Sequence, residues 1–126
     1  MNIRMRFIAL GLLVGLGGVP QALAQEIAPG ITYEVLKEHD ASLLPGVTKI
    51  VESIFIMQPG TKMDIPASPS MNICTSMLGE ITVTMGGETF VRRAGDQWTE
   101  PKGATMTVHN TGNVPYVDKT FEIFYE

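Results

Sequence analysis

The sequence GDQWTEPKGATMTVHN, residues 95–110, decides the fold class of this chain. Gly95 opens a turn, and Pro101 and Gly103 mark a sharp bend after five intervening residues. The segment that follows the bend, residues 105–110, alternates apolar and polar side chains as a half-buried strand does. The stretch therefore predicts a turn, a buried bend and the strand that leaves the bend.

The rest of the chain after residue 24 repeats this pattern of short β-rich segments between turn signals. Strands are expected at residues 31–37, 48–58, 71–78, 81–85, 88–92, 105–110 and 116–125. Residues 25–30 are expected to form a loose arm, and residues 61–70, which contain two prolines, a loop or an edge piece. Gly86-Gly87 predicts a two-residue hairpin turn. This spacing is typical of a small antiparallel sandwich or barrel.

The first 24 residues have the layout of a secretory signal peptide. Arg4 and Arg6 form a basic start, residues 7–19 are apolar, and Ala22-Leu23-Ala24 is a small-residue cleavage site. The apolar run is shorter than the roughly 20 residues of a membrane-spanning helix. We therefore expect an exported protein, periplasmic or secreted, with no membrane span after cleavage and a single domain over residues 25–126.

The net charge limits the partners that the protein is expected to bind, and the single cysteine excludes an internal disulfide. Removing Arg4 and Arg6 leaves seven basic and thirteen acidic residues, a net charge of −6. This balance argues against binding to nucleic acid or to anionic lipid surfaces. Cys74 is the one cysteine, so no internal disulfide can form, and it is expected to be a small buried side chain.

Six residues resemble the two motifs of the cupin superfamily over nearly all of the chain after the signal peptide. The matching residues are Gly60, Gly79, Gly95, Pro101, Gly103 and Asn110. The resemblance implies an all-β, single-domain cupin jelly-roll β-barrel, an antiparallel double sheet of six to eight strands. The chain is similar to the small single-domain cupins of the quercetin-dioxygenase-like type.

The metal ligands that the resemblance implies are replaced in this chain. The family's three histidines and one glutamate fall on Pro66, Ser68, Asn72 and Met106. Past the signal peptide the chain has only His39 and His109, and these cannot form the family's His-x-His pair. We therefore predict that the usual metal is absent and that no cofactor is bound.

The positions that would have held the metal are expected to line a cavity instead. Alternation along a strand places Cys74 and Ser76 on the same face as Asn72. The predicted ligand-binding residues are Ser68, Asn72, Cys74, Ser76, Trp98 and Met106. Trp98 is expected to pack at the bend, with ligand stacking as a second role. This composition suits a small, partly apolar molecule, so binding of a small molecule or of a protein partner is the main functional prediction.

Two other functional classes remain open at this point. One is an enzyme, either a metal-free isomerase or lyase or a metal enzyme with unusual ligands, with its catalytic residues unknown. Glu52, Glu100 and Glu122 are candidate acid–base groups, but no dyad is recognisable, and Asp118 and Lys119 are expected to pair across the surface. The other class is a structural or interaction protein with a closed cavity.

A soft-metal site and a homodimer are further hypotheses. Cys74 and Met106 supply sulfur ligands of the kind that Cu(I) prefers, although methionines more commonly fill core gaps. The strand at residues 31–37 is expected to present a free edge, through which two copies would pair.

Overall fold

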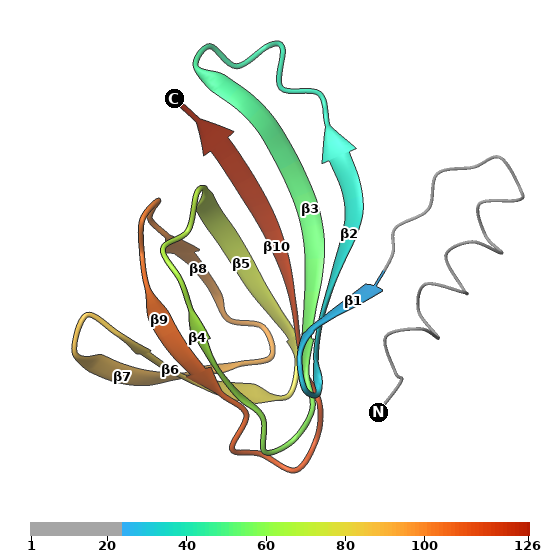
Figure 1. Cartoon of the computed structure of the whole chain (residues 1–126), viewed down its shortest axis with the longest axis vertical. Helices are drawn as coiled ribbons and strands as arrows, with labels where there is room; N and C mark the ends of the chain where they lie inside the picture. Colours follow the sequence, from blue (N-terminus) through green and yellow to red (C-terminus); the bar gives the residue numbers. More distant parts are fainter. Residues whose placement is uncertain (1–23) are drawn as a thin grey trace, which may run out of the picture.

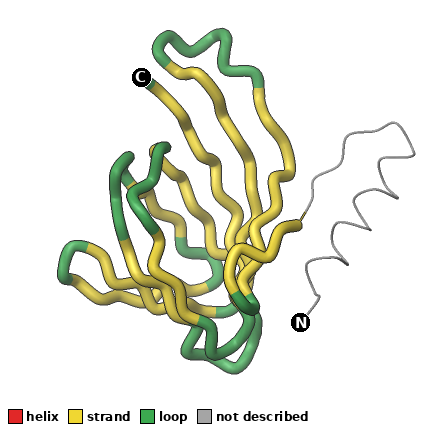
Figure 2. Tube along the Cα trace, viewed as in Figure 1, coloured by secondary structure: helices red, strands yellow, loops and turns green. Residues whose placement is uncertain are grey.

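The structure is a computed structural model that describes residues 24–126. The expected signal peptide lies outside the described residues, apart from Ala24. Figure 2 shows that the described chain consists of strands and loops. Across this part of the chain there is no helix long and apolar enough to cross a membrane.

Ten strands make up the described residues. They are β1 (Ala24–Ala28), β2 (Ile31–His39), β3 (Val47–Met57), β4 (Lys62–Ile65), β5 (Met71–Leu78), β6 (Glu80–Met85), β7 (Glu88–Arg93), β8 (Gln97–Glu100), β9 (Met106–His109) and β10 (Tyr116–Tyr125). The expected strands all form, within two residues at each end. Their number exceeds the expected six to eight because β1, β4 and β8 are short strands that the pattern assigns to an arm, a loop and a bend.

The strands form two antiparallel sheets that enclose the core (Figure 1). The large sheet has the order β1-β2-β3-β10-β5-β8, and the small sheet has the order β4-β9-β6-β7. The central core residues come from both sheets and are Ile31, Met57, Ile81, Val83, Met106, Val108 and Tyr116. The predicted double antiparallel sheet is therefore confirmed.

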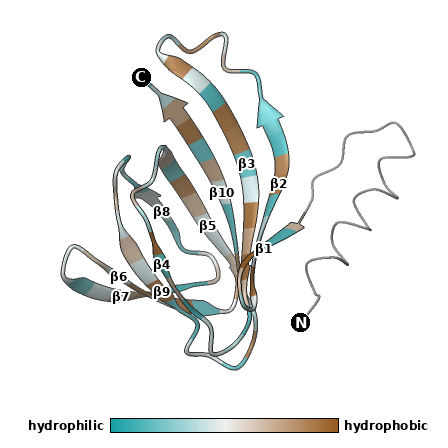
Figure 3. Cartoon of the chain, in the orientation of Figure 1, coloured by the Kyte–Doolittle hydropathy of each residue, from teal (hydrophilic) through white to brown (hydrophobic). Residues whose placement is uncertain are grey.

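The two faces of the large sheet follow the period-two rule along β10. Asp118, Thr120 and Glu122 point between the sheets, where they line a cavity. Lys119 alternates with them and binds Glu52 on the outer face. Figure 3 shows brown and teal bands mixed along β3 and β10, so both strands carry hydrophobic and hydrophilic residues over their length. The inner face of this sheet is consequently more polar than a core-facing sheet usually is.

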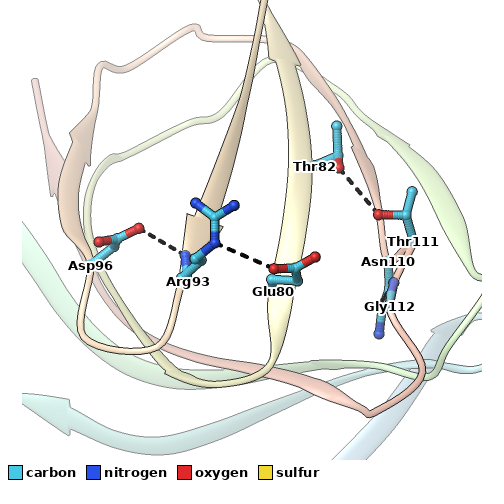
Figure 4. Close-up of polar contacts among 7 residues, drawn as sticks. All are labelled: Glu80, Thr82, Arg93, Asp96, Asn110, Thr111 and Gly112. Carbon is cyan, nitrogen blue, oxygen red and sulfur yellow. Dashed lines mark hydrogen bonds and ion pairs between the residues drawn. The ribbon is translucent and has the colours of Figure 1, made fainter.

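The hairpin turn predicted at Gly86-Gly87 is confirmed, and an aspartate side chain caps the turn at Gly95. Gly86 and Gly87 both have positive φ and close the hairpin between β6 and β7. The Asp96 side chain accepts a hydrogen bond of 2.8 Å from the backbone N–H of Arg93 (Figure 4). Arg93 in turn lies 3.4 Å from Glu80 across the hairpin. This cap holds the chain in the orientation in which β8 can pair with β5.

Asn110, at the end of the motif, ties three segments together. Its side chain is fully buried and donates to the carbonyl oxygens of Met57 and Val114, both at 2.9 Å. Its Oδ1 accepts from the Gly112 N–H at 3.0 Å; Figure 4 shows these two residues beside each other. The hydrogen bonds of this amide therefore connect the β9–β10 turn to the end of β3.

Two expectations about the N-terminal region are wrong. The segment expected to be a loose arm forms β1, because Pro29-Gly30 makes a tight turn that returns the chain onto β2. As a result β2 is not a free edge along its first half, where Ile31–Glu34 pair with β1. Only the second half of β2, from Val35 onward, has a free edge on that side. The homodimer stays a prediction, and this half of the strand is where two copies would pair.

Trp98 lies in a strand and not in an irregular bend. It belongs to β8, which adds to the edge of the large sheet by pairing with β5. The short polar and aromatic sequence of Gln97–Glu100 carries too few alternating positions to be recognised as a strand. Because of this pairing, Trp98 and Glu100 join the inner face of the large sheet.

Candidate functional site

A cavity of about 190 Å³ lies between the two sheets and is partly open to solvent. Its apolar lining residues, from both sheets, are Ile27, Phe55, Met63, Ile65, Ile81, Val83, Trp98, Met106 and Val108. The small sheet contributes only apolar side chains to the lining, and every polar lining residue comes from the large sheet. The cavity therefore has one apolar wall and one mixed wall.

The strand register arranges the polar side chains of the large sheet in rows. Glu122 of β10, Asn72 of β5 and Glu100 of β8 lie directly opposite one another in one row. Thr120, Cys74 and Trp98 form the next row. Asp118 lies in the row beyond, opposite Ser76. Side chains in such neighbouring positions are close enough to interact, so three acidic groups share one wall.

Glu100 is held by two neutral donors. The Trp98 indole Nε1 donates to its Oε2 at 2.9 Å, and the Asn72 Nδ2 donates to its Oε1 at 3.3 Å. The Glu100 residue is only 9% exposed. These two contacts fix the carboxyl group at the end of the row where β8 meets β5.

Glu122 accepts a short hydrogen bond from a tyrosine on a strand distant in sequence. The Tyr33 hydroxyl of β2 donates to its Oε2 at 2.6 Å. Burial and this bond raise the pKa of Tyr33 above its ordinary value, so the hydroxyl keeps its proton and remains a donor. The pair spans the mixed wall from β2 to β10.

Asp118 is a cavity acid whose pKa is raised. It is 8% exposed and accepts a hydrogen bond of 3.2 Å from Thr120 Oγ1. Burial, with a contribution from the nearby Glu100, raises its pKa to about 7, against partial opposition from the hydrogen bonds with Thr120 and Tyr116. A carboxyl group that titrates near neutral pH can exchange a proton with a ligand, which is the property that general acid–base chemistry requires.

No basic residue lines the cavity. Within residues 24–126 none of Glu100, Asp118 and Glu122 forms an ion pair. Glu52, on the outer face of the same sheet, shows the contrast, since Lys119 lies 2.8 Å and His39 2.9 Å from its oxygens. Glu52 on the outer face thus has two cationic partners when His39 is protonated, whereas the three acids inside the cavity have only neutral donors.

The six residues predicted to bind a ligand divide into two groups. Asn72, Cys74, Trp98 and Met106 line the cavity. Ser68 and Ser76 do not: Ser68 bonds with Ser70 at the β4–β5 connection, and Ser76 Oγ lies 2.7 Å from the Tyr116 hydroxyl in the core. Ligand binding by the first group remains a prediction.

The expectation that Asp118 pairs with Lys119 on the surface is wrong. It does not pair with Lys119 across the surface, because adjacent strand residues point to opposite faces, and only Lys119 faces outward. Tyr33 was not singled out, and Glu100 and Glu122 were named only as acid–base candidates. Alternation along the last strand places Asp118, Thr120 and Glu122 on the same face as Tyr116, but the sequence does not show that this face is the inner one.

The positions of the implied metal ligands show no alternative donor set. In the part of the chain that the structure describes, no three His, Cys, Asp or Glu side chains converge as metal ligands would. Pro66 is exposed and Ser68 is engaged with Ser70. The remaining residues do not fit the three-imidazole, one-carboxylate group of the family.

Cys74 lines the cavity as a thiol. Burial and the charge of Glu100 raise its pKa well above the ordinary value, and the Thr120 hydroxyl lies 3.4 Å from its sulfur. We expect the folded protein to react with a disulfide reagent at least about 100-fold more slowly than the denatured chain, because the thiolate is the reactive form. Rapid labelling of the folded protein at about pH 8 would contradict this assignment.

No protein-family model matches the chain, and no curated protein matches its sequence. Solved structures do match its backbone. The cupin domain of Schizosaccharomyces pombe Cnp3 is 16% identical over 86% of this chain and 71% of its own, with a TM-score of 0.64. A predicted oxalate decarboxylase from Thermotoga maritima is 16% identical over 82% of this chain and 92% of its own, with a TM-score of 0.63.

A third similar structure is a domain of a transcriptional regulator. The cupin domain of a transcriptional regulator from Enterobacter cloacae is 15% identical over 77% of this chain and 98% of its own, with a TM-score of 0.65. Three proteins with such different names share this backbone, so the likeness concerns architecture and not activity. Together with the two antiparallel sheets, these similarities show that the chain has the cupin fold.

Proposed function

We propose that this chain is an exported small-molecule-binding protein whose binding site is the cavity between the sheets. One observation carries the proposal: a cavity of about 190 Å³ combines apolar walls with a few fixed polar groups. Ligand sites in proteins have this composition, in which apolar surface supplies affinity and a few polar groups orient the ligand. Export is supported by the composition of residues 1–24 alone.

The size of the cavity limits the ligand. Its volume is below the roughly 300 Å³ at which pockets for drug-sized ligands begin. The Glu100 and Glu122 contacts hold polar groups in place before any ligand arrives, which lowers the entropic cost of binding. A small molecule of a few carbon atoms with one polar end is the occupant that fits best.

Trp98 offers a direct test, because it is the only tryptophan and it lines the cavity. Panels of small amines, alcohols, carboxylates and sugars are titrated into the protein while Trp98 emission is recorded. At least one chemical class is expected to produce a saturable change. If no class changes the emission, the cavity is not a small-molecule site.

A matched pair of variants shows whether the signal comes from the cavity. Ser53 lines it and is 2% exposed, whereas Ile54 points to the outer face of the same strand. Ser53→Phe, or Ser53→Leu if the larger change prevents folding, is expected to abolish the saturable change by filling the cavity. Ile54→Phe is expected to preserve it. A response that survives in folded Ser53→Phe would place binding elsewhere.

A further inference from the structure

We propose that two copies of this chain associate face to face, through the outer face of the large sheet. This face carries the side chains of β3, β5 and β10 that alternate with the cavity-lining ones. Its apolar centre, called the outer patch below, consists of Ile50, Ile54, Ile56, Ile73, Phe121 and Ile123. The inference is independent of the proposed ligand site, because the cavity lies on the opposite face of the sheet.

The strand register makes the outer patch continuous. Ile123 of β10 lies directly opposite Ile50 of β3, and Phe121 of β10 lies directly opposite Ile73 of β5. Ile54 is diagonal to Phe121, within reach of an aromatic side chain. The apolar side chains therefore touch across three neighbouring strands and form one surface.

No strand of residues 24–126 packs on the outer patch. Figure 1 shows the small sheet on one side of the large sheet, and the outer patch faces the other side. An antiparallel sheet with one face in water usually alternates apolar and polar residues, whereas Ile54, Phe55 and Ile56 are consecutive apolar residues of β3. Strands with apolar residues on both faces are typical of sheets that are covered on both faces, so a partner is expected here.

The charges of this face favour a second copy as that partner. Among the described residues of β3, β5 and β10, only Glu52 and Lys119 are charged side chains on the outer face, and they pair at 2.8 Å. The outer face of these strands thus carries no net charge, although the chain after residue 24 carries a net charge of −6. Two acidic copies can approach through a neutral surface without strong repulsion. A two-fold contact places a surface against itself, which one acid and one base on each copy allow.

The extent of the face suits a dimer. From β2 to β8 it spans five adjacent strands, which at about 4.8 Å per strand gives a width of about 24 Å. Ile50–Ile56 of β3 covers about 20 Å along the strand. The projected area is therefore roughly 500 Å², and protruding side chains expose more surface than this, which approaches the about 800 Å² per partner of a stable interface. Two sheets of the same twist also pack well face to face.

Sedimentation velocity tests the proposal on the protein produced from its full sequence. Wild type is expected to sediment as a dimer at about 100 µM and to dissociate on dilution. Ile73→Lys should weaken the dimer at least about 100-fold, because the contact would bury a charge without a partner. Ile54→Thr with Ile123→Thr keeps β-branched side chains and adds no charge, and it should weaken the dimer at least about 10-fold.

Two control variants locate the contact. Val91→Lys introduces the same charge on the outer face of the small sheet, where Val91 lies opposite Thr82, and should leave the dimer unchanged. Leu36→Asp introduces a charge on the free half of β2, where Leu36 is 39% exposed, and should also leave it unchanged. A dimer that is lost in Leu36→Asp and kept in Ile73→Lys would assign the contact to the strand edge and overturn the proposal.

The remaining outcomes are equally decisive. A wild-type protein that stays monomeric at about 100 µM would show that the outer patch does not join two copies, and would leave a different protein as its partner. An open series of larger oligomers would contradict the two-fold arrangement. If Ile73→Lys does not fold, the double threonine variant decides, and a dimer of wild-type strength in that folded variant would refute the proposal.

Discussion

Asp118→Asn is expected to raise the free energy of unfolding by roughly 2 to 4 kcal/mol at about pH 8. The raised pKa of about 7 means that the folded state binds the Asp118 proton more tightly than the unfolded chain does. The stabilisation from that proton is full below about pH 4 and is lost as the pH rises towards about 7. Asparagine cannot ionise, so the variant avoids the cost of a buried charge.

The pH profile distinguishes this cause from a packing effect. Urea unfolding followed by Trp98 emission should show wild type and Asp118→Asn converging towards about pH 4 and separating above it. Glu52→Gln should behave oppositely, because Lys119 and His39 lower the pKa of Glu52 and stabilise its charged form. Its deficit should appear at neutral pH and fade in acid. A destabilised Asp118→Asn at about pH 8 would refute the assignment of Asp118 as a buried acid.

Asn110→Ala is expected to lower the free energy of unfolding by about 3 kcal/mol or more. The substitution leaves the buried carbonyl oxygens of Met57 and Val114 and the Gly112 N–H without their partner. Asn110→Asp keeps the acceptor for Gly112 but loses both donors and places a charge against two carbonyl groups, so it should be at least as damaging.

Asn113 provides the matched control for Asn110. It lies in the same turn, is exposed and forms no side-chain hydrogen bond to a described residue. Asn113→Ala should therefore change stability by less than about 0.5 kcal/mol in the same denaturation experiment. Equal losses in the two alanine variants would show that the turn sequence, and not the buried amide, carries the effect.

The fold was predictable from the sequence because its strongest signals are local. Gly95, Pro101 and Gly103 mark turns through backbone conformation, which depends little on the rest of the molecule. The Gly86-Gly87 hairpin is recognisable for the same reason. Of the three short strands that the sequence pattern did not assign, β1 and β8 depend on pairing with β2 and β5, which no local pattern of four or five residues reveals.

The candidate site was only partly predictable. The motif positions led to Asn72 and Met106, and alternation from Asn72 led to Cys74. Asp118 was missed because both faces of β10 carry apolar residues, with Phe121 and Ile123 on the outer face. Hydrophobicity therefore does not say which face is inward. The link between Tyr33 and Glu122 joins residues 89 apart in sequence and becomes visible only once the sheet order is known.

Filling the cavity tests the central claim most directly. Calorimetry measures the binding of the compound that changes Trp98 emission most strongly, in wild type and in folded Ser53→Phe and Ile54→Phe. The account predicts saturable binding in wild type and in Ile54→Phe, and none in Ser53→Phe. Equal binding in all three proteins, or none in wild type, would contradict it.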